Sequence, residues 1–224
     1  GFGAWNFDPK VDGEIGTVLS GKTASGVETV TEESIDRLPK PVRNWLRSAG
    51  VPGTEKIRTV KLSQTGALRL NPDQDWSSVK AEQYVNTEDP AFIWRVKMKL
   101  FSVVPLAGRD KFADGKGDME IKVGSLFPVV SERSNEKLNQ AALQRYLAEI
   151  GWYPTAALRP YINWEELDEH TAEATMEYEG TSGSVTFQFS DGYDLEKITA
   201  MRYRDTGEKA EKKEWIGEVK ETKV

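Results

Sequence analysis

Two segments of the chain carry hydrophobic residues at helical spacing. The first lies between Thr31 and Gly50, and its apolar positions are Val42, Trp45, Leu46 and Ala49. The second lies between Ser134 and Gly151, and its apolar positions are Leu143, Tyr146, Leu147 and Ile150. Spacing of three or four residues places these side chains on one face of a helix. We therefore predict two amphipathic helices, the second capped by Ser134, each ended by a glycine.

Most of the remaining chain alternates between hydrophobic and polar residues, which is the period of a half-buried β-strand. From Ala91 to Phe101, Arg95, Lys97 and Lys99 alternate with apolar residues and are predicted to face water. Similar alternation occurs in the segments 60–70, 79–85, 119–123, 172–178, 185–189, 195–203 and 214–224. No strand–helix–strand unit recurs, which argues against a parallel sheet. We predict an α+β fold: a curved antiparallel β-sheet, as a half-barrel or open barrel, with a few helices packed on its apolar face.

Residues 1–30 show scattered aromatic residues followed by Gly, Ser and Thr, without a sustained period. They are predicted to form an irregular N-terminal lead-in, and residues 31–224 a single α+β domain. The chain begins with Gly1 rather than Met, so we expect that its natural start has been removed. A cleaved tag explains this glycine most simply, and a signal peptide or membrane anchor is the alternative.

The composition excludes several classes of site. The 224 residues contain 30 Lys and Arg against 36 Asp and Glu, which gives a net charge of −6 and argues against a nucleic-acid partner. Cysteine is absent, so disulfides, thiolate nucleophiles and iron–sulfur clusters are excluded. With one histidine, two-histidine metal motifs are impossible as well. We predict no cofactor and no metal.

The acidic residues are distributed unevenly. Between Tyr161 and Glu196 the chain has ten acidic residues and neither lysine nor arginine. Glu173, Glu177 and Glu179 fall on the polar face of one predicted strand, and their mutual repulsion is tolerable only where that face meets water or cations. This sheet face is therefore predicted to be wet.

Two polar clusters invite a chemical interpretation. His170 follows four acidic residues and could act as a general base or metal ligand, or lie in an exposed turn. Asp110, Asp114 and Asp118 could hold calcium, but they lack the alternate spacing of a calcium loop and also suit a polar hairpin turn. The sequence favours the turn in both cases.

A third cluster lies in and after the second predicted helix. Arg145 and Glu149 are four residues apart, either as an exposed pair or as a partly buried pair that orients a polar head group. Trp94, Trp152 and Tyr153 could line the same pocket, although aromatic residues more often form simple core. These five residues are the predicted ligand-binding site, and no catalytic residue is predicted.

The same region carries a recognisable motif. It combines RYLAE at Arg145–Glu149, WYPTA at Trp152–Ala156 and, upstream, LPKPVRNWLRSAGVPG at Leu38–Gly53. These residues resemble a bacterial family of unknown function, whose members often carry an N-terminal hydrophobic segment. The resemblance implies membrane anchorage through a removed N-terminal segment. More loosely, the predicted sheet with a central helix is similar to the half-barrels of periplasmic lipoprotein carriers, which is an analogy of fold.

Three functional hypotheses follow. The first is a non-enzymatic module of the bacterial cell envelope that binds an apolar or amphipathic, lipid-like ligand in a sheet-enclosed cavity. The second is a carboxylate-based hydrolase, which requires two close carboxylates in a cavity. The third is a structural or protein-interaction domain, which predicts an exposed apolar patch or open sheet edge.

Overall fold

The computed structural model describes residues 9–21, 26–69, 73–100, 104–123, 127–203, 205, 207 and 209–220. Its helices are α1 (Pro9–Ser20), α2 (Glu32–Asp36), α3 (Lys40–Ser48) and α4 (Glu136–Glu149), followed by the 3₁₀ turns η1 (Ile150–Trp152) and η2 (Pro154–Leu158). The first six strands are β1 (Thr59–Leu68), β2 (Ser77–Asn86), β3 (Ala91–Leu100), β4 (Val104–Ala113), β5 (Lys116–Val123) and β6 (Phe127–Glu132). The last five are β7 (Ile162–Asp168), β8 (Thr171–Tyr178), β9 (Thr181–Phe189), β10 (Leu195–Tyr203) and β11 (Lys212–Glu218).

Contacts gather in two compact units, each with its own sheet. The first unit contains Thr59–Ala113 and Asp118–Arg133 with the N-terminal segment up to Ala24. The second contains Ser25–Arg58, Asp114–Gly117 and Ser134–Val224. The predicted α+β class with antiparallel strands is confirmed, but the strands divide between two sheets. Alternation shows which residues share a face, not which strands pair, so the sequence did not reveal this division.

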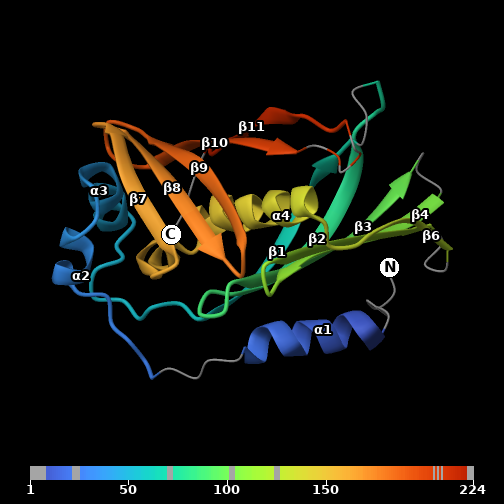
Figure 1. The fold of residues 1–224 in the computed structure, drawn as a ribbon, viewed down its shortest axis with the longest axis horizontal. Helices are drawn as coiled ribbons and strands as arrows, with labels where there is room; N and C mark the ends of the chain where they lie inside the picture. The colour runs from blue at the N-terminus through green and yellow to red at the C-terminus, as the bar shows by residue number, and fades with distance from the viewer. Residues whose placement is uncertain are drawn as a thin grey trace. The chain divides into compact units, whose positions relative to one another are not determined.

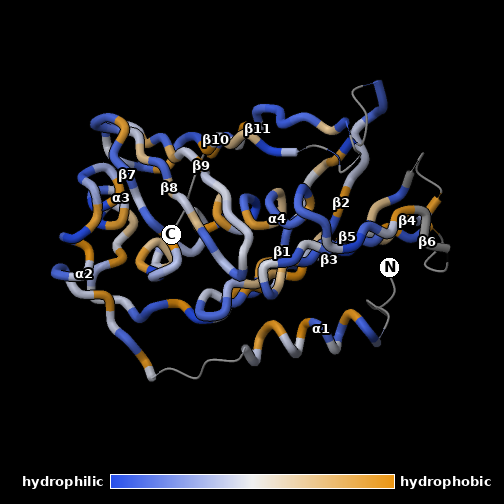
Figure 2. The backbone as a smooth tube through the Cα atoms, in the orientation of Figure 1, coloured by the Kyte–Doolittle hydropathy of each residue, from blue (hydrophilic) through white to orange (hydrophobic). Residues whose placement is uncertain are grey.

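The first unit is a six-stranded sheet in the order β1-β2-β3-β4-β5-β6, with α1 packed on one face (Figure 1). Figure 2 shows hydrophobic residues returning along α1 about once per turn. These are Val11, Ile15 and Val18, which pack with Tyr84, Ala91 and Ile93 of the sheet. At the end of α1, Gly21 has φ +61°, and a Cβ there would lie 2.6 Å from Asn86 Nδ2. That same Asn86 amide donates to the Val18 carbonyl at 2.9 Å, which holds the end of α1 against the sheet.

The expected irregular lead-in over residues 1–30 is therefore wrong for Pro9–Ser20, while residues 1–8 and 22–25 lie outside the described residues. Gly13 and Gly16 lower the intrinsic helix propensity of this segment and obscured its apolar spacing. The helix is stabilised instead by burial of its apolar face against the sheet. Whether residues 31–224 fold as one domain stays a prediction.

The sheet face under α1 carries charged residues beside its apolar ones, which corrects a second expectation. Arg95 was predicted to face water, yet its side chain is buried. It pairs with Glu82 of the neighbouring strand and, at 3.1 Å, with Asp12 of α1. Burial alone raises the pKa of the Glu82 carboxyl, but hydrogen bonds from Arg95 and Tyr84 outweigh it and the pKa is lowered. Arg95 can be buried on this face because the carboxylates of Glu82 and of Asp12 in α1 compensate its charge.

The second unit is a five-stranded sheet in the order β11-β10-β9-β8-β7. Its buried face presents Ala172, Ala174, Met176, Val185, Phe187, Phe189, Ile198 and Ala200. The first predicted helix is divided into α2 and α3 by residues 37–39. Helices α3 and α4 cover this face: the Trp45 ring centre of α3 lies 5.5 Å from that of Phe189, and α4 packs along β9 and β10 (Figure 1). The cap of α4 is Asn135 rather than Ser134, because the Asn135 side chain accepts from the Leu138 amide at 2.9 Å.

Candidate functional site

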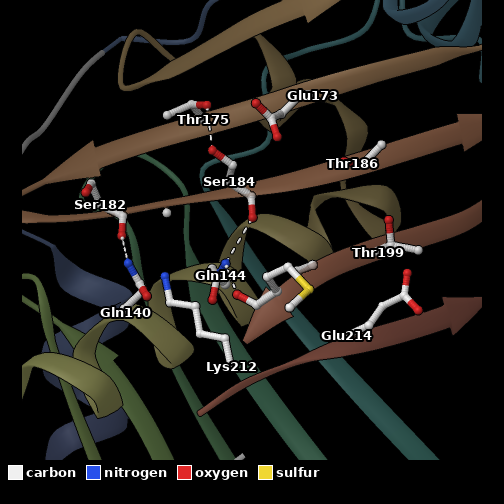
Figure 3. A pocket seen from close by; sticks show the side chains of 13 residues that line it. Gln140, Gln144, Glu173, Thr175, Ser182, Ser184, Thr186, Thr199, Lys212 and Glu214 are labelled. Atoms are coloured by element: carbon white, nitrogen blue, oxygen red, sulfur yellow. Dashed lines mark hydrogen bonds between the residues drawn. The ribbon is translucent and has the colours of Figure 1, made fainter. Parts of the chain in front are cut away.

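A pocket of about 410 Å³ lies on the polar face of the second sheet (Figure 3). Strands β8, β9, β10 and β11 contribute to it, together with two glutamines of α4. Its hydroxyl groups come from Thr175, Ser182, Ser184, Thr186 and Thr199. Because these residues alternate with the buried ones, the strand period that builds the core also brings the hydroxyls together on the opposite face.

The strand register sets the order of these groups across the sheet. Thr186 lies directly opposite Glu173 on one side and Thr199 on the other, so three neighbouring strands place polar side chains in a row. In the adjacent row, the hydroxyls of Thr175 and Ser184 are 2.9 Å apart and hydrogen-bonded. Cross-strand neighbours of this kind hold each other in place, so the pocket wall is preorganised.

The pocket forms where β9 and β10 separate. Their paired residues run from the Leu195–Phe189 pair to the Thr199–Thr186 pair. Beyond that point, Gln144 Nε2 donates to the Ser184 carbonyl at 3.0 Å and to the Met201 carbonyl at 3.1 Å. One carboxamide of α4 thus bridges the two strands where their own ladder has stopped.

Close packing of α4 makes this bridge possible. Gly183 of β9 lies beneath Gln144, and a Cβ at this position would come within 2.7 Å of Gln144 Cγ. Gln140, one turn earlier, donates to the Ser182 carbonyl at 2.9 Å. The helix therefore substitutes for a strand neighbour along this part of β9.

The Gln144 carboxamide is fixed in one orientation. Both Nε2 protons are used by strand carbonyls, which fixes the position of Oε1, an atom that can only accept. The residue is 4% exposed, and Oε1 has no hydrogen-bond partner among the described residues. A buried acceptor without a donor costs about 1 to 3 kcal/mol. Among the described lining residues, this atom is the one buried side-chain acceptor without a hydrogen-bond partner.

The charged side chains of the pocket are mostly acidic. Glu173 comes from β8 and Glu214 from β11, and Lys212 is the basic lining residue. The Lys212 amine lies 5.3 Å from the centre of the Tyr203 ring. Figure 3 shows Lys212 pointing toward the end of the pocket where Gln140 and Gln144 lie.

The structure places the predicted ligand-binding residues elsewhere. Arg145 and Glu149 form a largely buried ion pair of 2.9 Å on α4. Tyr153 is fully buried, whereas the neighbouring Trp152 is 53% exposed. Trp94 belongs to the first unit, where its indole nitrogen donates to Gln64 at 2.8 Å. None of the five lines the described pocket, and their role in ligand binding stays a prediction.

The other candidate clusters have structural partners. His170 Nδ1 lies 3.1 Å from the Ser190 carbonyl, and Nε2 lies 3.9 Å from Asp191. Asp118 pairs with Arg109, and Asp114 occupies the β4–β5 turn with φ 52°. Within the described residues, no group of three or more potential metal ligands occurs.

Two buried tyrosines give the second unit a pH dependence. Burial raises the pKa of the Tyr146 and Tyr153 phenols well above the ordinary value of 10.0, with further increases from Tyr161 beside the first and Glu149 beside the second. The folded chain therefore keeps protons that the unfolded chain loses above this pH. Stability should be full below about pH 10 and should fall as the pH rises further. Urea unfolding between about pH 8 and 11 measures this decline.

Phenylalanine substitutions supply the control for this prediction. Tyr146→Phe and Tyr153→Phe each remove one retained proton, so the unfolding free energy of each variant should fall less steeply with pH than that of the wild type. Profiles that stay parallel to the wild type would show that these phenols do not cause the alkaline loss.

The comparisons with known proteins give a family but no activity. A model of a family of unknown function, DUF6544, matches residues 28–224. The chain belongs to this family. It matches no curated protein and no solved structure. The family match confirms the predicted membership of an unknown-function family, and α1 lies before the matched region. In the parts of the chain that the structure describes, no helix is long and apolar enough to cross a membrane.

Proposed function

We propose that the protein is a non-enzymatic binding module and that the pocket on β8–β11 holds the polar part of its ligand. The observation that carries this proposal is the polar pocket itself. Hydroxyls from three strands line it, and Gln144 bridges the gap between β9 and β10. A volume of about 410 Å³ suits a small molecule or a head group. Donors, acceptors and charges on a rigid sheet are the groups that fix a ligand's orientation.

The polarity of the lining restricts the ligand. A hydrocarbon in this pocket would desolvate hydroxyl and carboxylate groups without replacing their hydrogen bonds to water, which is unfavourable. An amphipathic ligand avoids this cost by placing its polar end among the hydroxyls. Met201 lines the pocket and is 53% exposed, and Ile216 projects from the same sheet face because it lies opposite Thr199. These two side chains would contact the apolar part.

Nuclear magnetic resonance titration of the full chain tests this function. The probes are glucose, which supplies hydroxyl donors and acceptors, and octyl glucoside below its micellar concentration, which adds an apolar tail. We expect both to shift the backbone amides of 182–186 and 199–201, with tighter binding of octyl glucoside. Shifts confined to other parts of the chain, or no shifts, would overturn the proposal.

A matched pair of variants locates the binding. Thr186→Val with Thr199→Val keeps the β-branched shape but removes two pocket hydroxyls, so the dissociation constants should rise severalfold. Thr65→Val, at an exposed strand position of the first unit, serves as control and should leave binding unchanged. The cell-envelope location and N-terminal anchorage are further proposals from the sequence, and fractionation of cells that express the natural gene tests them.

A further inference from the structure

We infer that the pocket selects a ligand with a positively charged group, such as a primary ammonium, over neutral and anionic ligands of the same shape. This inference rests on the proposed binding function and adds the charge of the ligand. Two carboxylates and one ammonium line the pocket, so its own charge is negative. A cationic group would meet attraction there, whereas an anion would be repelled by both glutamates.

The strand register concentrates negative charge at one end of the pocket. Glu173 lies directly opposite Glu165 of β7. Like charges at directly opposed positions of antiparallel strands destabilise the sheet. Among the described residues, neither carboxylate forms an ion pair or a side-chain hydrogen bond. The sheet therefore carries an uncompensated repulsion beside the pocket, which a bound cation would relieve.

The basic side chains nearby do not cancel this charge. Lys212 stands at the far end of the pocket, on β11, beside the Tyr203 ring. Lys197 of β10 lies opposite Gln188, two residues along the strand from Thr199, and does not line the pocket. The end of the pocket at β8, beside Glu165 of β7, thus keeps its negative charge.

The neutral lining groups also suit an ammonium. An ammonium offers three donors and no acceptor. The hydroxyl oxygens of Thr186 and Thr199 lie in one row with Glu173 and can accept hydrogen bonds from an ammonium. The Gln144 oxygen, at the end toward which Lys212 points, also lacks a donor. Two hydroxyl acceptors in one row with a carboxylate are the complement of a charged amine.

Three sugars of matched shape test the charge selection. The full chain is titrated at about pH 6 and low salt with glucose, glucosamine and glucuronate, and the amide shifts of 182–186 and 199–201 give the dissociation constants. We expect glucosamine to bind at least tenfold more tightly than glucose and glucuronate to bind more weakly than glucose. The preference should shrink in about 0.5 M salt, because ions screen exposed charges.

Two substitutions on the same strand make the test specific. Glu173→Gln should remove most of the preference for glucosamine while glucose binding persists. Glu177→Gln changes the same residue type on the same face of β8 but outside the pocket, and should leave the preference intact. Glu173→Gln should also fold at least as stably as the wild type, because it ends the repulsion with Glu165.

The possible outcomes distinguish the charge selection from the proposed binding function on which it rests. Equal binding of glucose and glucosamine at the pocket would overturn the charge selection and leave the binding function standing. A preference that survives Glu173→Gln would also overturn it, since the charge would then come from elsewhere. Absence of any shift in the pocket amides with all three sugars would overturn both.

Discussion

Replacing Gln144 with glutamate should lower the free energy of unfolding by roughly 3 to 5 kcal/mol, a large part of the stability of an ordinary domain. The wild-type carboxamide donates two hydrogen bonds to the Ser184 and Met201 carbonyls. A carboxylate has no proton to donate, so both carbonyls would face a negative charge at a buried position. Protonation would restore one donor, and the loss should therefore be smaller at low pH. Urea unfolding at about pH 7 and pH 5 measures both effects.

Two further variants test the cause of this loss. Gln144→Leu removes the same donors without adding charge, so its destabilisation should be smaller, at about 1 to 3 kcal/mol. Gln140→Glu, one turn earlier on α4, changes a half-buried amide that makes one bond to Ser182 and should cost less again. A Gln144→Glu variant as stable as the wild type would show that the carboxamide does not hold β9 and β10 together.

Hydrophobic spacing was sufficient to predict part of the fold. Trp45 and Leu46 in α3, and Leu143 and Leu147 in α4, repeat at helical spacing and are buried, as expected. The strands were visible because alternate residues meet core and solvent. Strand pairing could not be predicted, because alternation of hydrophobic and polar residues is compatible with more than one register and with one sheet or two.

The pocket was hidden from the sequence for a related reason. Thr186 and Thr199 are ordinary polar residues of two strands, and only the register makes them neighbours. Gln144 stands beside the apolar stripe of α4, where nothing in the sequence marks it as a bridge between strands. The acidic stretch from Tyr161 to Glu196 was the available signal, because it indicated a wet face that tolerates or attracts cations. Tyr153, one of the predicted ligand-binding residues, is buried, and packing of its ring in the core is sufficient to explain this burial.

Replacing Arg109 with methionine should be the second large destabilisation, at about 3 to 5 kcal/mol, because it removes one partner of a buried ion pair. The Arg109 side chain is 5% exposed and lies 3.6 Å from Glu14 of α1, and it also pairs with Asp118. Without the guanidinium, the Glu14 carboxylate would keep only Lys111, at 3.4 Å, in a poorly hydrated position. α1 should then detach, and faster hydrogen exchange of its amides would report this.

The double variant Arg109→Met with Glu14→Met separates the pair's net contribution from the cost of breaking it. In the wild-type ion pair, several buried atoms, including Arg109 Nη1 and Glu14 Oε2, have no hydrogen-bond partner among the described residues. The pair therefore recovers little of its desolvation cost. The partners left behind, Asp118 and Lys111, are more exposed than Arg109 and Glu14, so removing both charges should return stability to within about 1 kcal/mol of the wild type. Lys40→Met, which breaks the exposed pair with Glu169, should change stability little. A double variant as unstable as Arg109→Met would mean that the ion pair, rather than the apolar contacts of Val11, Ile15 and Val18, holds α1 on the sheet.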